Sequence, residues 1–145
     1  MFRMLLSPQL CGRGRCYLKD NRDLALGWLA KAESDLSAAR WMLGGEGPYD
    51  TACFHAQQAI EKALKTLLAF HTQPIPRSHD LDELQRLVLT VYPDPELAAL
   101  DLAEATDYAV ALRYDIEFWP EKSTAQEAVM LATRVLEIIR AVVGK

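Results

Sequence analysis

Four polar side chains between residues 49 and 71 have the types and the spacing to bind a phosphate group or the edge of a nucleobase. They are His55, Gln58, Lys62 and Lys65. At about 100° per residue, these positions fall within one narrow arc of a helix. Ammonium groups hold phosphate, and imidazole and carboxamide groups bind polar edges. The spacing predicts a ligand-binding stripe; the alternative interpretation is a solvated helix face.

Gln57 and Glu61 lie at the boundary between this stripe and the apolar side of the same helix. A boundary position predicts partial burial, and a buried polar group needs a hydrogen-bond partner. The simplest partners lie across a pair of helices or across a dimer interface. We therefore expect these two residues to have a structural role, in helix packing or in dimerisation.

A second candidate group lies at the end of a later helical segment, at Arg113 and Tyr114. Arg113 could hold a phosphate, or it could complement the negative end of the helix dipole while Tyr114 packs beneath the next loop. Phe118 and Trp119 follow. They could form a stacking platform for a base, or an apolar plug or dimer contact.

Other catalytic and metal-binding patterns are absent from the sequence. It contains no GxxxxGK[ST], no HExxH and no paired-cysteine zinc spacing. The three histidines, His55, His71 and His79, form no ligand array on one helix face. The sequence therefore predicts no metal and no cofactor.

Helices must position these residues, because apolar residues recur at spacings of three and four in five segments. The first two helices are expected at residues 24–43 and 49–71. The third begins at Ser78 or Asp80 as N-cap and ends near residue 92, and the fourth begins at residues 93–95 and extends past residue 112. Ser123 or Thr124 is expected to cap the fifth, with Glu127 completing a capping box. Short links predict an all-α, up-and-down antiparallel bundle of four to five helices.

Residues 1–20 show no helical periodicity, and we expect an irregular tail before a single domain over residues 21–145. The first 22 residues hold five of the 16 basic residues, so an RNA-binding arm is the alternative. The formal net charge of -4 argues against a broad non-specific nucleic-acid surface. Three cysteines, no secretory signal and no bilayer-length apolar stretch predict a cytoplasmic protein with reduced thiols and no membrane association.

The string FHAQQAIEKALK, at residues 54–65, resembles a helix of the HEPN family (higher eukaryote and prokaryote nucleotide-binding domain). Weaker matches lie in the family's order at residues 29–36 (LAKAESDL), 77–81 (RSHDL) and 113–115 (RYD). In the last of these, Asp115 stands where the family has Pro. The resemblance covers residues 24–143.

The resemblance implies a helical bundle that usually dimerises and works near nucleotides or RNA. Many HEPN relatives are ribonuclease toxins, or partners of a small nucleotidyltransferase in a two-component system. The ribonucleases carry an Arg-x4-6-His motif, in which His transfers a proton at the ribose 2′-hydroxyl and Arg holds the phosphate. Here Phe118, Trp119 and Pro120 occupy the expected positions of that His, and none of them can transfer a proton.

Our leading hypothesis is a HEPN-type module that dimerises, binds a nucleotide or RNA, and partners a small nucleotidyltransferase in a toxin–antitoxin-like system without cleaving RNA. The expected ligand-binding residues are His55, Gln58, Lys62, Lys65, Arg113 and Tyr114. The first alternative is a metal-independent ribonuclease toxin that uses Arg113 with a displaced histidine, His55 or His79. The second is a purely structural protein-interaction domain.

Overall fold

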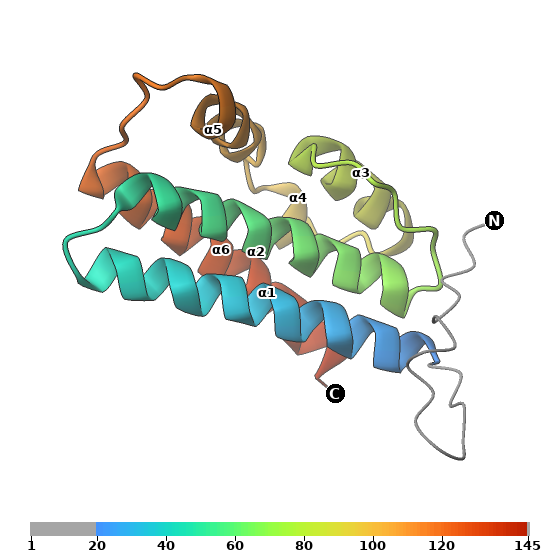
Figure 1. Ribbon diagram of the computed structural model, residues 1–145. Coiled ribbons are helices and arrows are strands. Elements are labelled where there is room, and N and C mark those ends of the chain that lie inside the picture. The colour runs from blue at the N-terminus through green and yellow to red at the C-terminus, as the bar shows by residue number, and fades with distance from the viewer. Residues whose placement is uncertain (1–19, 145) are drawn as a thin grey trace, which may run out of the picture.

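The computed structural model describes residues 20–144, without the side chains of Tyr108 and Ala109, and this part of the chain forms six helices and no strand (Figure 1). The helices are α1 (Asn21–Gly44), α2 (Tyr49–Phe70), α3 (Leu81–Val91), α4 (Pro95–Ala98), α5 (Ala103–Tyr114) and α6 (Lys122–Val143). The prediction of an all-α bundle is confirmed. Residues 1–19 lie outside the described range, so the predicted tail stays a prediction.

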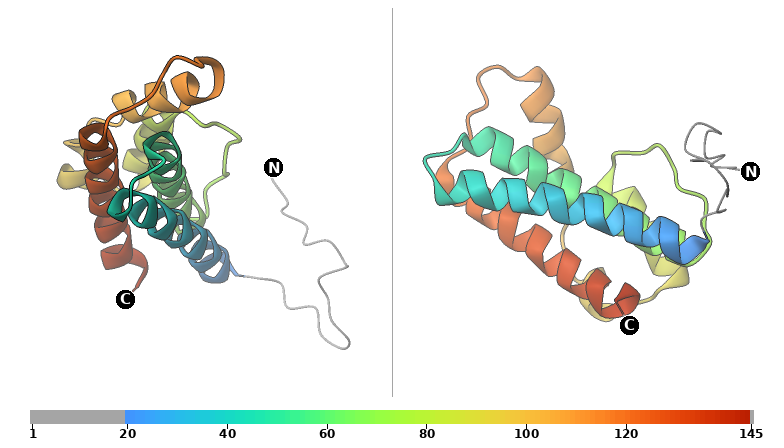
Figure 2. Two further views of the ribbon diagram at one scale, coloured as in Figure 1. Left: turned by 60° about the vertical axis from the view of Figure 1, so that its left-hand side comes forward. Right: turned by 60° about the horizontal axis from the view of Figure 1, so that its bottom comes forward.

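Helix α2 lies at the centre of the bundle. Helices α1 and α6 pack along it on one side, and α3 and α5 cover it on the other (Figures 1 and 2). Fourteen of its 22 residues are buried. A polar side chain on the buried faces of α2 therefore has little access to solvent and needs partners within the chain.

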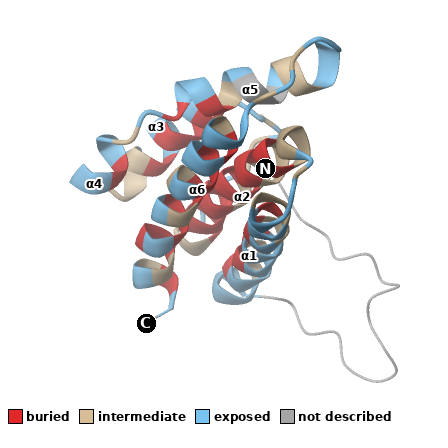
Figure 3. Cartoon of the chain, turned by 90° about the vertical axis from the view of Figure 1, so that its left-hand side faces the viewer, coloured by how far each residue is buried: buried red, intermediate tan, exposed pale blue. Residues whose placement is uncertain are grey.

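The packing of α1 follows from alternating small and large residues. Its buried positions are Ala25, Leu29, Ala32, Leu36 and Ala39. Spacings of four and three keep one narrow stripe facing the neighbouring helix, and alternating residue sizes let facing layers interlock. Buried residues line the inner faces of the helices (Figure 3).

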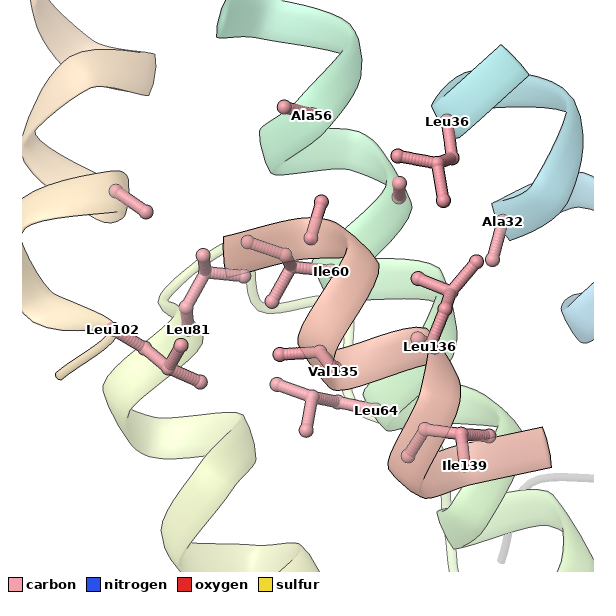
Figure 4. Close-up of a cluster of buried hydrophobic side chains, with 14 of the residues drawn as sticks. Ala32, Leu36, Ala56, Ile60, Leu64, Leu81, Leu102, Val135, Leu136 and Ile139 are labelled. Carbon is pink, nitrogen blue, oxygen red and sulfur yellow. The ribbon is translucent and has the colours of Figure 1, made fainter. Parts of the chain in front are cut away.

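The core joins side chains from distant parts of the sequence (Figure 4). Ile60 and Leu64 of α2 lie among Leu81 of α3, Leu102 before α5 and Val135 of α6. All five are almost completely buried. The apolar core thus holds α2 in place along most of its length.

The prediction of one helix that begins at residues 93–95 and extends past residue 112 is wrong. The chain forms two helices there, with a break between α4 and α5. A break leaves backbone carbonyls without helical partners. Here the Gln85 Nε2 group of α3 donates hydrogen bonds to the carbonyl oxygens of Leu97, at 2.7 Å, and Leu100, at 2.9 Å. A buried side chain from another helix therefore provides hydrogen bonds to the carbonyl groups at the break. The local spacing of apolar residues cannot reveal such a contact.

Two predicted N-caps have opposite outcomes. Asp80 caps α3, and its carboxylate accepts hydrogen bonds from the backbone N–H groups of Asp82 and Glu83. The cap expected at Ser123 or Thr124 is wrong, because α6 begins at Lys122 and Glu121 is its N-cap without a side-chain hydrogen bond.

Candidate functional site

The first part of the candidate site is a carboxylate of α1 that faces α2. Asp35 Oδ1 lies 2.8 Å from His55 Nδ1, and Asp35 Oδ2 accepts a hydrogen bond from Lys62 Nζ at 2.5 Å. His55 and Lys62 are spaced so that both reach the same acid. The side chain of Asp35 is 13% exposed, so this ion pair is largely shielded from solvent.

A second carboxylate, Glu61, has the same arrangement deeper in the bundle. Its Oε1 accepts a hydrogen bond from Lys65 Nζ at 2.7 Å, and its Oε2 lies 3.0 Å from Nδ1 of His79, just before α3. Lys65 Nζ also lies 5.6 Å from the centre of the Trp28 ring of α1, within the range of a cation–π interaction. Both Glu61 and Lys65 are buried.

These contacts change the interpretation of the α2 stripe. The spacing predicts Lys65 on a polar face, but it is buried. Lys62 and Lys65 each form an ion pair with a carboxylate. Lys62 and His55 are half-buried at the edge of the bundle. The described part of α2 therefore presents no row of uncompensated cations.

Gln57 and Glu61 are buried, more completely than their boundary position predicts. Glu61 finds its partners within the chain, on its own helix and in the loop before α3. Gln57 Oε1 accepts a hydrogen bond from Gln58 Nε2 at 2.9 Å. The predicted role of these two residues in a dimer remains a prediction.

Arg113 and Tyr114 lie elsewhere, on the last turn of α5 and exposed to solvent. Tyr114 is 80% exposed, and Ile116 and Trp119 in the following loop are 89% and 72% exposed. In the described part of the chain, no ion pair or hydrogen bond joins Arg113 to the α2 residues. The structure thus divides the predicted site into a paired group on α2 and an exposed group at the end of α5.

Both candidate proton-transfer histidines have a carboxylate at Nδ1. Such a contact orients the ring and leaves Nε2 to face a reacting group. His79 fits this role better than His55, because its side chain is 58% exposed and that of His55 is 29% exposed.

Asp35 and Trp28 are site residues that the sequence analysis missed. The available signal was weak: Asp35 directly precedes Leu36 in the apolar stripe of α1, so that its carboxylate lies beside the packed face. Among the described residues, no group of three or more His, Cys, Asp or Glu could hold a metal ion. Nor is any helix in this range long and apolar enough to cross a membrane.

Comparisons with known proteins agree with this fold. A solved structure, that of TT1696 from Thermus thermophilus, is similar to this chain at 30% sequence identity with a TM-score of 0.64. The similarity covers 81% of this chain and 96% of that one. No curated protein sequence matches significantly. The family profile of the HEPN domain matches residues 25–142, and the chain therefore belongs to the HEPN domain family.

Proposed function

We propose that this protein is a HEPN-type binding module for a nucleotide or RNA, which acts beside a small nucleotidyltransferase in a toxin–antitoxin-like system. The observation that carries the binding role is the exposed group at the end of α5 and in the loop that follows. There Arg113 offers a cation for phosphate, and Tyr114 and Trp119 offer aromatic faces for bases.

The α2 residues take a smaller part in this proposal. Lys65 is buried against Glu61, so it would have to break an ion pair to bind phosphate. His55, Gln58 and Lys62 are half-buried and could contact only the edge of a ligand. Phe118, Trp119 and Pro120 replace the histidine of the ribonuclease motif, which favours binding without cleavage.

The test measures nucleotide binding and RNA cleavage side by side on purified wild type and Arg113→Ala. We expect binding without cleavage, weakened about tenfold by Arg113→Ala, because a charge-assisted bond to phosphate is lost. Arg86→Ala is the matched control, since Arg86 is an exposed arginine on α3. Equal binding by all three proteins would remove the α5 end from the proposal.

A second candidate function is metal-independent RNA cleavage, favoured by the contact between Glu61 and His79. A buried carboxylate that orients an exposed imidazole is suited to general acid–base chemistry. Cleavage that disappears in both His79→Ala and Arg113→Ala would establish this function. Cleavage that persists in both variants would exclude these two residues.

The proposed partners are a second copy of the chain and a small nucleotidyltransferase, both in the cytoplasm. The exposed apolar side chains of Ile116 and Trp119 are suited to a protein contact. Co-expression with a small nucleotidyltransferase, followed by co-purification, tests the second partnership. Assembly without nucleotide or RNA binding would instead favour a purely structural interaction domain.

A further inference from the structure

A small cleft of about 50 Å³ opens between α2, α5 and α6. Its buried wall includes Cys53 and Ile60 of α2. Three exposed acids, Asp101, Glu104 and Glu127, also line it, and no basic residue is among its described lining residues. Burial, and secondarily the charge of Asp50, raises the pKa of the Cys53 thiol to about 11, so the thiol adds no charge at neutral pH.

One buried polar group of this cleft lacks a partner. Gln57 lines the cleft and is only 2% exposed, and its Nε2 group makes no hydrogen bond in the described structure. Its Oε1 is engaged by Gln58, which fixes Nε2 as the unsatisfied end. An unsatisfied buried amide is unfavourable, and an incoming hydrogen-bond acceptor would remove that cost.

The charge and hydrogen-bonding needs of the cleft define its ligand. The exposed carboxylates of Asp101 and Glu127 favour a cation and repel phosphate. The Gln57 amide on the wall is an unsatisfied donor, so it needs a hydrogen-bond acceptor. The apolar side chains of Ala128 and Leu131 suit the methylene stem of a long side chain.

We propose that this cleft binds an arginine or lysine residue of a partner protein. The cationic head lies against the carboxylates of Asp101 and Glu127, and a peptide carbonyl accepts a hydrogen bond from Gln57 Nε2. The site is separate from Arg113 and from the ion pairs of α2. It does not require that the partner be a nucleotidyltransferase or that the protein bind RNA.

The test follows the Gln57 side-chain amide signal by NMR in the nitrogen-15-labelled full chain. Gln57→Leu identifies the signal by its disappearance. The probe is N-acetyl-arginine N-methylamide, and its neutral isostere N-acetyl-citrulline N-methylamide is the matched ligand. We expect a saturable shift with the arginine probe, and a response to the citrulline probe that is at least about threefold weaker.

Two variants separate the cleft from general surface charge. Glu127→Gln removes one acid of the cleft and should weaken binding of the arginine probe about threefold, because one carboxylate contact is lost. Glu137→Gln makes the same change at an exposed position of α6 outside the cleft lining and should have no effect. Equal shifts with the two probes, no shift with either, or a larger shift with a nucleoside monophosphate would each overturn the proposal.

Discussion

Two regions of the chain combine a cationic residue with an aromatic residue, in opposite surroundings. In the first region, Lys65 is buried, paired with Glu61 and located over the Trp28 ring. In the second, Arg113 and Tyr114 are exposed at the end of α5. Similar residue types thus serve the fold in one place and are available to a ligand in the other.

Coverage by neighbouring helices produces this difference. Helix α2 is surrounded, so its cations lose water and each must be compensated by an acid. Asp35 and Glu61 provide this compensation. In each carboxylate, both oxygens have one partner. The end of α5 lies at the edge of the bundle, where a cation keeps its hydration and needs no fixed partner.

The largest expected effect tests the buried half of this comparison. Glu61→Ala leaves the Lys65 ammonium buried without its acid, and we expect the free energy of unfolding to fall by about 3 kcal/mol. Urea denaturation followed by circular dichroism measures the change. The double variant Glu61→Leu, Lys65→Met removes both charges and should recover most of the loss. A loss below about 1 kcal/mol in the single variant would show that Lys65 regains water.

The next effect is smaller because the Asp35 pairs are nearer the surface. Asp35→Ala should lower the free energy of unfolding by about 1.5 kcal/mol, between the values typical of exposed and buried pairs. Glu33→Ala is the control on the same helix, since Glu33 pairs with Arg140 at the surface and both side chains are at least 40% exposed. We expect that control to change stability by less than about 0.5 kcal/mol. Equal losses in the two variants would remove the distinction between shielded and surface pairs.

The sequence was sufficient for the bundle but not for the surroundings of its polar residues. Heptad-like spacing in α1 and the long helical string of α2 are local signals, so they predict the helices well. The partners of Lys62 and His79 depend on which helices meet in space, and no local pattern encodes that. The role of Gln85 could not be predicted for the same reason, because its hydrogen bonds join α3 to the carbonyl groups at the break between α4 and α5.

The smallest effect on stability is expected in the exposed loop after α5. A substitution there should change self-association of the protein instead. Trp119→Ser removes a side chain that is 72% exposed, so the free energy of unfolding should change by less than about 0.5 kcal/mol. If the loop after α5 contacts a second copy, self-association should weaken about tenfold, as measured by analytical ultracentrifugation. Trp41→Ser is the matched control, because Trp41 is 85% exposed on α1. Weaker association in Trp41→Ser alone would move the contact to the end of α1, and the loop after α5 would then be left for ligand binding.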